Sequence, residues 1–457
     1  MQMKDLQMKK ALRSVLIVLL LCVAGMTKVY AVTIGDLNYT LNSNTLTATV
    51  TGHKDSTAAT GNLIIPSSVT YGGQTYSVTS IDNYAFQNCS GLTGSLIIPN
   101  TVTFIGGFAF ENCSGFTGDL VIPDSVTTMG GCVFHGCSGF TGSLTIGNSV
   151  TSIEINVFGD CSGFTGSLNI GNSVTTIGDG AFQYCSGFTG SLTIPNSVTS
   201  IGVNAFFGCS GFTGSLTIGN CVSTIRLGSF YGCSGFTGDL VIPNSVILIE
   251  GWTYYTGAFE GCSSFTSLTI GNSITMIGAS AFEGCSGFSG NLIIPNSVTT
   301  IGPGAFKNCS GFTGSLNIPN SVNEIGAGAF SNCSGFTGEL LIPNSLISIE
   351  SDGYYGGTFS ECSGFTGSLT IPNSVTTIGS HAFSHCSSFT GSLTIGNSVT
   401  EIGSYAFYGC SGFTGSLTIG NSVTEIGGAA FEGCSGFTGS LTIGNSVTEI
   451  GSYAFYG

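Results

Sequence analysis

The 24 residues from Cys410 to Gly433 read C-S-G-F-T-G-S-L-T-I-G-N-S-V-T-E-I-G-G-A-A-F-E-G. Leu417 and Ile419 alternate with polar residues, which predicts a short strand with one buried face. The stretch V-T-E-I predicts a second extended piece, and the Gly-Asn-Ser between the two predicts a corner. The stretch G-G-A-A-F-E-G is too short and too rich in Gly for a stable helix, so we expect short turns there, helical or 3₁₀ at most.

Close variants of this unit fill most of the chain. Its opening cysteine returns every 24 residues, with one gap of 23 and two of 29, and such a period is typical of a solenoid. A lone unit cannot bury its eight apolar side chains, whereas stacked units can, with equivalent strands pairing in parallel at about 4.8 Å. We therefore predict a leucine-rich repeat solenoid over residues 62–457, in about sixteen repeats of 23–29 residues, with parallel β-strands on one face and short turns on the other. Sixteen strands would stack to roughly 75 Å.

Stacking turns each apolar position of the unit into a ladder of side chains. Two Phe ladders should dominate the stability, because burying one such side chain is worth roughly 1.5–3 kcal/mol. An Asn ladder at the corner should be structural, since Asn tolerates left-handed turns and bonds to neighbouring backbone. The predicted structural ladders include Phe86, Phe110, Phe134, Cys89, Cys113, Cys137, Asn148 and Asn172.

The cysteine ladder has three interpretations. The thiols can pack as small apolar groups. Neighbouring Cα atoms about 5 Å apart would also allow disulfides. A metal would need four convergent ligands, which a linear ladder does not supply. We favour buried thiols, and a thiol titration of the denatured chain separates them from disulfides.

The N-terminus differs from the repeats. A basic stretch from Lys4 to Arg13 and an apolar stretch from Val15 to Gly25 predict a signal peptide over residues 1–31, cleaved after Ala31. No later segment is continuously apolar, so we expect no transmembrane span after it. Residues 32–61 alternate apolar and polar side chains, which predicts an N-terminal β cap.

The C-terminal end carries no cap in the sequence. The chain stops at Gly457, one residue before the next expected cysteine. A solenoid needs a polar terminal unit, so we expect that the repeats are truncated at the C-terminus.

Charge excludes one class of partner. Only 7% of the residues are charged, and five of the eight basic residues lie in the first 28. A chain that starts at residue 32 has three basic and 22 acidic side chains, a net formal charge of −19. Nucleic-acid binding needs clustered Lys and Arg, so this chain is not expected to bind nucleic acid.

The repeat also carries a family resemblance. The pattern L-x-I-P-N-S-V-T-x-I-G-x-x-A-F-x-x-C, seen from Leu192 to Cys209, resembles the BspA-like leucine-rich repeats, also called the Treponema pallidum type. The resemblance covers residues 62–457, and most units depart from it by an extra Gly (C-S-G-F-T-G-S-L-T-I). The stretch from Ile64 to Ile81 is similar to the first repeat of such proteins from Bacteroidales. The resemblance implies a bacterial surface or secreted protein of the adhesin type, whose relatives bind host matrix proteins or other bacteria.

Few residues suggest chemistry. The chain has four His, and it lacks a nucleophile–base pattern, a phosphate-binding loop and a dinucleotide fingerprint. His381 and His385 are four residues apart without a metal-binding pattern. Glu401, Glu425 and Glu449 should stack, and we favour a solvated edge over a calcium site. We therefore predict no enzyme, no catalytic residue, no metal and no cofactor.

Two insertions are the most informative departures from the repeat. Each 29-residue gap adds five residues at the same point, giving E-G-W-T-Y-Y-T-G over 250–257 and E-S-D-G-Y-Y-G-G over 350–357. Loops on one face of a solenoid often carry binding, and Trp and Tyr are typical of contact hot spots. Alternatively, their aromatic rings fold back onto the coil. The loops are four coils apart, which predicts a separation of roughly 20 Å. The candidate ligand-binding residues are Trp252, Tyr254, Tyr255, Tyr354 and Tyr355.

These observations predict a non-enzymatic binding protein, secreted or held at the outer cell surface. The resemblance implies that its partner is a host extracellular-matrix protein or another surface protein, bound by the solenoid. One alternative is a carbohydrate-binding surface protein that uses the aromatic loops to bind a glycan. Another is a structural spacer that presents a missing C-terminal domain. The spacer is favoured by the fact that residues 439–457 repeat residues 391–409 unchanged.

Overall fold

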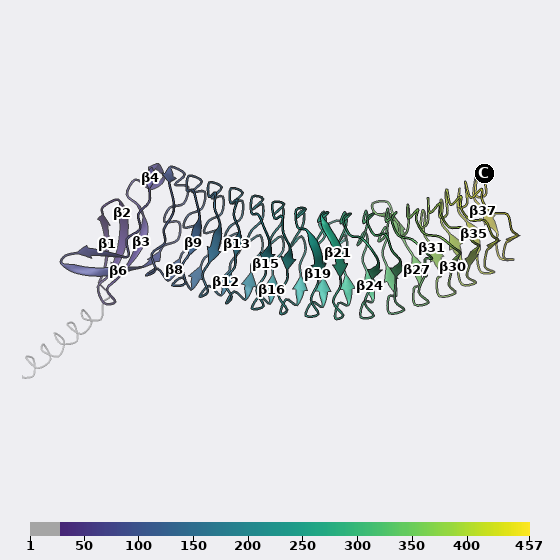
Figure 1. The fold of residues 1–457 in the computed structure, drawn as a ribbon, viewed down its shortest axis with the longest axis horizontal. Coiled ribbons are helices and arrows are strands. Elements are labelled where there is room, and N and C mark those ends of the chain that lie inside the picture. Colours follow the sequence, from purple (N-terminus) through teal and green to yellow (C-terminus); the bar gives the residue numbers. More distant parts are fainter. Residues whose placement is uncertain (1–27) are drawn as a thin grey trace, which may run out of the picture.

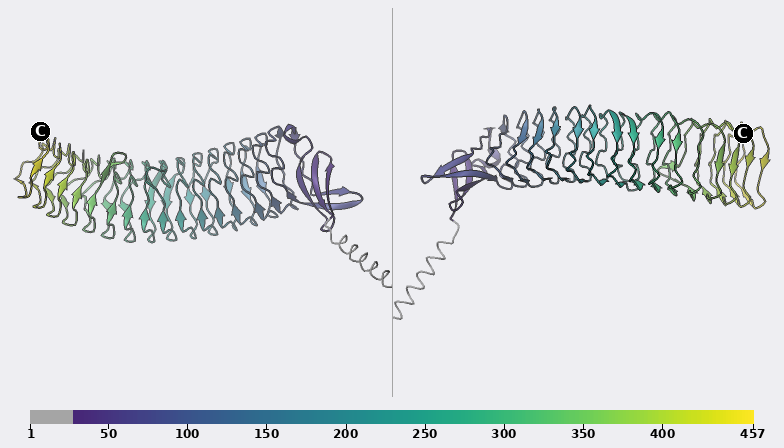
Figure 2. Two further views of the ribbon diagram at one scale, coloured as in Figure 1. Left: turned by 180° about the vertical axis from the view of Figure 1, so that it is seen from behind. Right: turned by 60° about the horizontal axis from the view of Figure 1, so that its bottom comes forward.

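The chain winds into an elongated, gently curved parallel β-solenoid (Figures 1 and 2). The computed structural model describes residues 28–457, so the predicted signal peptide lies outside the described residues except for residues 28–31. The predicted fold class, a leucine-rich repeat solenoid, is confirmed. Between residues 28 and 457, no helix has the length and hydropathy that a membrane span requires.

One row of strands comes from the V-T-x-I stretches. Nearly every strand buries its second residue, usually Ile, and turns the preceding residue outward, because successive side chains point to opposite faces. Most neighbouring strands pair in parallel, as Thr176 with Ser200 and Ile177 with Ile201. The row consists of β8 (Phe104–Ile105), β10 (Thr128–Met129), β12 (Ser152–Ile153), β14 (Thr176–Ile177), β16 (Ser200–Ile201), β18 (Thr224–Ile225), β20 (Leu248–Ile249), β22 (Met276–Ile277), β24 (Thr300–Ile301), β26 (Glu324–Ile325), β27 (Ser348–Ile349), β31 (Thr377–Ile378), β33 (Glu401–Ile402), β35 (Glu425–Ile426) and β37 (Glu449–Ile450).

A second row comes from the L-x-I stretches, and it runs beside the first along the solenoid (Figure 1). Residues 63–65, 96–98 and 340–342 carry the same pattern but are not strands. The row consists of β9 (Leu120–Ile122), β11 (Leu144–Ile146), β13 (Leu168–Asn169), β15 (Leu192–Thr193), β17 (Leu216–Thr217), β19 (Gly238–Val241), β21 (Phe265–Thr269), β23 (Leu292–Ile293), β25 (Leu316–Asn317), β30 (Leu369–Ile371), β32 (Leu393–Ile395), β34 (Leu417–Thr418) and β36 (Leu441–Thr442).

The third side of each coil is a run of hydrogen-bonded turns, which we call the turn face. In the first coil the Gln87 N–H donates to the Tyr84 carbonyl at 3.2 Å. Tyr84 and Asn88 have φ of 58° and 61°, and equivalent residues of most coils also have positive φ. Left-handed residues interrupt a right-handed helix, so turns form instead of the helical alternatives. The one 3₁₀ helix between residues 28 and 457 is η1 (Ser56–Ala58), which lies outside the turn face.

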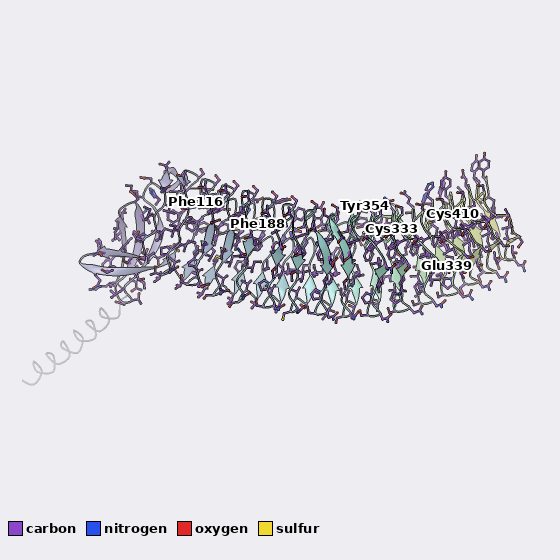
Figure 3. All side chains as sticks on the ribbon, in the orientation of Figure 1. Phe116, Phe188, Cys333, Glu339, Tyr354 and Cys410 are labelled. Atoms are coloured by element: carbon purple, nitrogen blue, oxygen red, sulfur yellow. The ribbon has the colours of Figure 1, made fainter. Side chains whose placement is uncertain are left out.

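The core contains two continuous ladders of Phe rings. Phe110 and Phe134 are fully buried, and their ring centroids lie 5.3 Å apart with planes at 1°. Phe116 and Phe188 mark the second ladder (Figure 3). In that ladder Phe164 and Phe188 are 5.0 Å apart. Each ring therefore contacts the rings of both neighbouring coils, which ties the coils together by apolar contact.

The ladder cysteines lie beside these rings as free, buried thiols. The Cys113 Sγ–H donates to the Phe86 carbonyl oxygen at 3.0 Å, and Cys137 donates to Phe110 at the same distance. The bond recurs along the ladder, and each of these carbonyls also accepts the backbone N–H of the cysteine three residues later, as Phe86 does from Cys89 at 3.0 Å. Burial raises the pKa of the Cys113 thiol to about 12, so the thiol stays neutral.

The corner asparagines bond from coil to coil. The Asn148 N–H donates to Asp124 Oδ1 at 2.6 Å, and the Asn172 N–H donates to Asn148 Oδ1 at 3.0 Å. Each side chain thus satisfies a backbone donor of the next coil, which pins the corner without a ligand.

The N-terminal residues form an antiparallel meander of β1 (Val29–Ile34), β2 (Leu37–Asn42) and β3 (Thr47–His53). Strand β3 pairs in parallel with β6 (Gln74–Ile81), so the meander extends the first row beyond β8. The remaining strands here are β4 (Gly61–Asn62), β5 (Ser68–Tyr71) and β7 (Leu92–Thr93). Cleavage after Ala31 would remove the first three residues of β1.

Candidate functional site: two aromatic loops

The first insertion is a compact turn that follows β20. Tyr254 has φ of 68°, and the Tyr255 N–H donates to the Trp252 carbonyl at 2.9 Å. This turn places the Trp252 and Tyr255 rings 6.0 Å apart at 87°. The side chains of Trp252, Tyr254 and Tyr255 are 64, 63 and 61% exposed.

The second insertion is a small hairpin of β28 (Ser351–Asp352) and β29 (Gly356–Gly357). Asp352 closes it, because its Oδ1 accepts the N–H groups of Tyr354 at 2.9 Å and Tyr355 at 2.5 Å. Tyr354 is exposed and points outward at the upper edge of the solenoid in Figure 3. Tyr355 points inward and is only 1% exposed, so its ring is not a free platform for a ligand.

The two loops touch each other. The Tyr254 N–H donates to the Tyr355 hydroxyl oxygen at 3.1 Å, across 101 residues of chain. The Tyr254 ring lies 5.2 Å from that of Tyr354 and 6.1 Å from that of Tyr355. The predicted separation of roughly 20 Å is therefore wrong. We call the cluster of Trp252, Tyr254, Tyr255, Tyr354 and Tyr355 the aromatic clasp.

The contact is possible because small residues leave a trough between the loops. Ser280, Gly304 and Gly328 occupy one position of three successive coils, all with positive φ. A Cβ added at Gly304 would lie 2.6 Å from the Tyr355 ring, and one at Gly328 would overlap the Tyr355 carbonyl. Ser280 Oγ–H donates to the Tyr355 hydroxyl at 3.4 Å. The Tyr355 side chain therefore lies along the solenoid axis and spans the intervening coils.

A lysine that the sequence did not single out completes the clasp. Lys307 Nζ lies 5.6 Å from the ring centroid of Tyr355 and 5.9 Å from that of Tyr354. It also donates to the Tyr354 carbonyl at 3.4 Å. These distances fit cation–π attraction. The sequence offered one signal for Lys307, the rarity of basic residues, since residues 28–457 contain only four Lys and Arg.

The His and Glu candidates line up with side chains of neighbouring coils. His381 stacks on Tyr405 at 4.8 Å, and burial together with nearby His385 lowers the pKa of His381. Glu401 and Glu425 pair in register as exposed residues of β33 and β35. No group of three or more His, Cys, Asp and Glu between residues 28 and 457 has a metal-binding arrangement.

One cluster of an imidazole and two carboxylates was not predicted from the sequence. His135 Nε2 lies 3.0 Å from Asp160 Oδ2, and His135 Nδ1 lies 3.8 Å from Glu111 Oε1. The three residues come from successive coils, so the spacing of the cysteines was a signal for their proximity. The cluster places an imidazole between the carboxylates of the two neighbouring coils.

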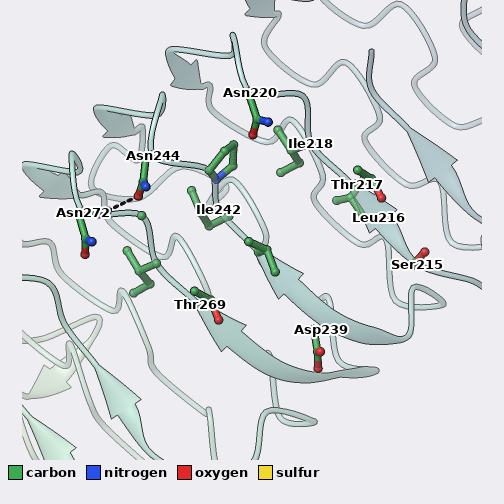
Figure 4. Close-up of a pocket in the computed structure, with 14 residues that line it drawn as sticks. Ser215, Leu216, Thr217, Ile218, Asn220, Asp239, Ile242, Asn244, Thr269 and Asn272 are labelled. Carbon is green, nitrogen blue, oxygen red and sulfur yellow. Dashed lines mark hydrogen bonds between the residues drawn. The ribbon is translucent and has the colours of Figure 1, made fainter. Parts of the chain in front are cut away.

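The solenoid also has a furrow between the L-x-I strands and the Asn corner (Figure 4). One stretch, of about 760 Å³, lies between Thr217, Val241 and Thr269 and the corner residues. The Asn272 N–H donates there to Asn244 Oδ1 at 2.8 Å. A second stretch of about 620 Å³ repeats the arrangement in the C-terminal coils, beside Thr370, Thr394 and Thr418. The furrow is therefore a consequence of the repeat, whereas the clasp occurs once in the described residues.

The repeats are similar to those of known leucine-rich repeat proteins. A family model described as BspA type leucine rich repeat region matches residues 67–189, 189–257, 253–357 and 355–457. A leucine-rich repeat protein from Bacteroides ovatus is 27% identical, with a TM-score of 0.65, over 92% of this chain and 99% of that one. A leucine rich cell surface protein from Faecalibacterium prausnitzii is 24% identical, with a TM-score of 0.46, over 90% of this chain and 94% of that one. No curated protein sequence matches the chain.

Proposed function

The chain belongs to the family of BspA-type leucine-rich repeat proteins, and on this premise we propose that it is a non-enzymatic, adhesin-type binding protein. It acts outside the cell and binds a protein partner at the aromatic clasp. The predicted signal peptide over residues 1–31 supports export. A long solenoid supports presentation of a contact site away from the point of attachment.

The observation that carries the proposal is the exposure of four large rings in one fixed cluster. Trp252, Tyr254, Tyr255 and Tyr354 are each more than three-fifths exposed. Residues of these types dominate the energy of protein contacts, because they bury a large area at a small cost in side-chain entropy. A tolerated loop would bury its rings against the coil, as only Tyr355 does.

The clasp is also organised before a partner arrives. Asp352 closes the second loop, and the Tyr355 hydroxyl ties it to the backbone of the first. Contacts that fix a loop in the free protein reduce the entropy lost on binding. The same rings would also serve as platforms for a glycan, so the test includes both ligand classes.

The test is binding of the purified protein to immobilised extracellular-matrix and bacterial surface proteins, with a glycan array in parallel. We expect a protein hit that the Trp252→Ala/Tyr354→Ala variant loses, by about 2 kcal/mol or more per hot-spot residue. Tyr71→Ala is the matched control, since Tyr71 is exposed on the N-terminal hairpin, away from the clasp.

Three outcomes contradict the proposal. Protein binding that persists in the folded double variant moves the site elsewhere on the solenoid. Binding to glycans alone makes the clasp a sugar platform. No binding to either array favours the spacer interpretation.

A further inference from the structure

Aromatic side chains continue along the turn face on both sides of the clasp. On the N-terminal side, the Phe207 ring lies 5.3 Å from that of Tyr184 and 4.5 Å from that of Tyr231. All three side chains are exposed or half-buried. Each comes from a different, successive coil, so their line runs along the solenoid axis.

The C-terminal side carries a second aromatic group, from two successive coils. The His381 and Tyr405 rings stack 4.8 Å apart at 3°, and Tyr408 lies 5.7 Å from Tyr405. His381 and Tyr405 are exposed, and Tyr408 is half-buried. We call these two groups and the clasp together the aromatic stripe, with flanking residues Tyr184, Phe207, Tyr231, His381, Tyr405 and Tyr408.

The two loops that carry the clasp pack against the coils that carry the flanking groups. Thr256 of the first loop lies over Gly228, with its Oγ1 3.1 Å from the Cβ position there, and Gly228 shares a coil with Tyr231. At the other end, a Cβ at Gly357 would overlap the carbonyl oxygen of His381. The three groups therefore follow one another on adjacent coils of the turn face.

Backbone groups of the stripe are already bonded between coils. The Tyr184 N–H donates to the Phe207 carbonyl at 2.7 Å, and the Tyr405 N–H donates to the Gly428 carbonyl at 2.9 Å. A partner cannot add a strand to a surface whose donors are used in this way. Side chains must recognise it, through ring faces and Tyr hydroxyl groups.

The charged groups around the stripe are mainly acidic, and Lys307 at the clasp is the one lysine among them. Burial raises the pKa of Tyr231, and the nearby carboxylates of Glu260 and Glu283 raise it further. On the C-terminal side, Glu432 occupies the position of Tyr408 one coil later. Arg226, which lies in the same part of the chain, is held by Asp179 at 3.3 Å and Glu250 at 3.5 Å. A cationic partner complements this surface, whereas nucleic acids and anionic polysaccharides are repelled.

We propose that the aromatic stripe binds a basic, proline-rich protein segment lengthwise, in the polyproline II conformation. The proposal rests on the proposed function and names the partner segment. Proline-rich segments dock on aromatic-lined surfaces because their conformation is set before binding. Their backbone has free carbonyl oxygens, which Tyr hydroxyl groups can donate to, and Arg or Lys side chains pair with the carboxylates.

The dimensions are compatible with this partner. Successive coils advance by ring-to-ring steps such as 5.1 Å from Phe182 to Phe206 and 5.3 Å from Phe206 to Phe230. One turn of polyproline II is about 9 Å long, so each turn spans nearly two coils. The partner therefore presents a prolyl face to the stripe at almost every second coil.

The test uses a synthetic peptide that repeats Pro-Pro-Arg-Pro, with the whole purified protein. Its controls repeat Pro-Pro-Gln-Pro, which lacks the charge, and Gly-Ser-Arg-Gly, which lacks the conformation. A linear neutral β-glucan is the fourth ligand. We expect calorimetry to show the tightest binding for the first peptide, weakened by added salt.

The matched variants lie in the flanking groups, outside the clasp. Phe207→Ala and Tyr405→Ala should each lower the affinity for the Pro-Pro-Arg-Pro peptide by about tenfold. Ala429 has the position of Tyr405 two dozen residues later and the same left-handed conformation, with φ of 56° against 59°, so Tyr405→Ala should keep the fold. Tyr71→Ala should bind as the unmodified protein does.

Equal binding of the Gly-Ser-Arg-Gly peptide, preference for the glucan, or unchanged affinity in folded flanking variants would overturn the inference. These failures are distinct from failure of the proposed function. A protein hit that depends on Trp252 and Tyr354, but not on Phe207 and Tyr405, keeps the proposed function and removes the polyproline partner.

Discussion

Two kinds of coil make up this solenoid, and their contacts differ in range. The coils at 391–409 and 439–457 are identical in sequence and contact only their neighbours, through rings, thiols and Asn side chains. The coils with insertions at 250–257 and 350–357 contact each other across three intervening coils. The stability of a solenoid is approximately the sum of the stabilities of its units and of the contacts between neighbouring units. The clasp is an exception, because it joins coils that are not neighbours.

The difference separates stability from specificity. The uniform coils repeat one set of core contacts, so none of them gives its position in the solenoid a distinct surface. The insertions leave the core ladders unbroken, since Phe230 and Phe259 remain 5.2 Å apart beside the first one. A unique surface is therefore added to a periodic core without disturbing it.

The largest effect should come from alkaline pH, which acts on the core of every coil. Burial raises the pKa of all fifteen ladder thiols, for example to about 12 at Cys209 and Cys434 against 9.0 for a free thiol. The unfolded chain therefore loses protons first. Stability is fully present below about pH 9 and falls as the pH rises toward 12, by about 1.4 kcal/mol per thiol and pH unit.

Thermal midpoints by circular dichroism, measured from about pH 7 to about pH 11, check this prediction. Replacing Cys285, Cys309 and Cys333 by Ala should flatten the decline. A midpoint that is constant across this range would show that the thiols are not buried as neutral groups.

Next in size is the loss of one ring from the uniform core. Phe282 is fully buried between Phe259 at 5.5 Å and Phe306 at 5.3 Å. Phe282→Ala should lower the free energy of unfolding by about 3–5 kcal/mol. The control is Ile293→Ala, an exposed residue that should change it by about 0.5 kcal/mol or less. Equal effects in denaturant unfolding would refute the ladder as the main source of stability.

A smaller effect is expected from filling the trough under the clasp. The added methyl group of Gly304→Ala would lie 2.6 Å from the Tyr355 ring, which should cost about 1–3 kcal/mol. Near-ultraviolet circular dichroism should report displacement of the rings. In a Tyr355→Ala background the same change should cost less, and a double-mutant cycle measures the coupling. Additive effects would mean that Tyr355 does not occupy the trough.

The smallest effect should follow the loss of one hydroxyl group. Tyr355→Phe keeps the ring but removes the acceptor of the Tyr254 N–H, at a cost of about 0.5–1.5 kcal/mol. Hydrogen exchange at the Tyr254 amide should become faster, while amides of the uniform coils keep their rates. Unchanged exchange at Tyr254 would mean that the two loops are not linked by this bond.

Much of the fold was predictable because the sequence pattern of each unit indicates the conformation of that unit. The alternation around Leu417 and Ile419 and the 24-residue return of Cys410 indicated stacked parallel strands. For the turn face, the sequence did not distinguish plain turns from helical or 3₁₀ turns. Local composition does not reveal positive φ at residues such as Tyr84. The five candidate site residues were found from the insertions, but the inward orientation of Tyr355 and the role of Lys307 were not.

The sequence by itself determined the period, the parallel stacking and the buried ladders, because these depend only on a unit and its nearest neighbours. Only the tertiary structure decided that the two insertions form one site. Their meeting depends on the backbone conformation of each loop and on Ser280, Gly304 and Gly328, which lie 75, 51 and 27 residues before Tyr355. No local pattern encodes a contact of that range, since the free space that permits it exists only after the coils have stacked.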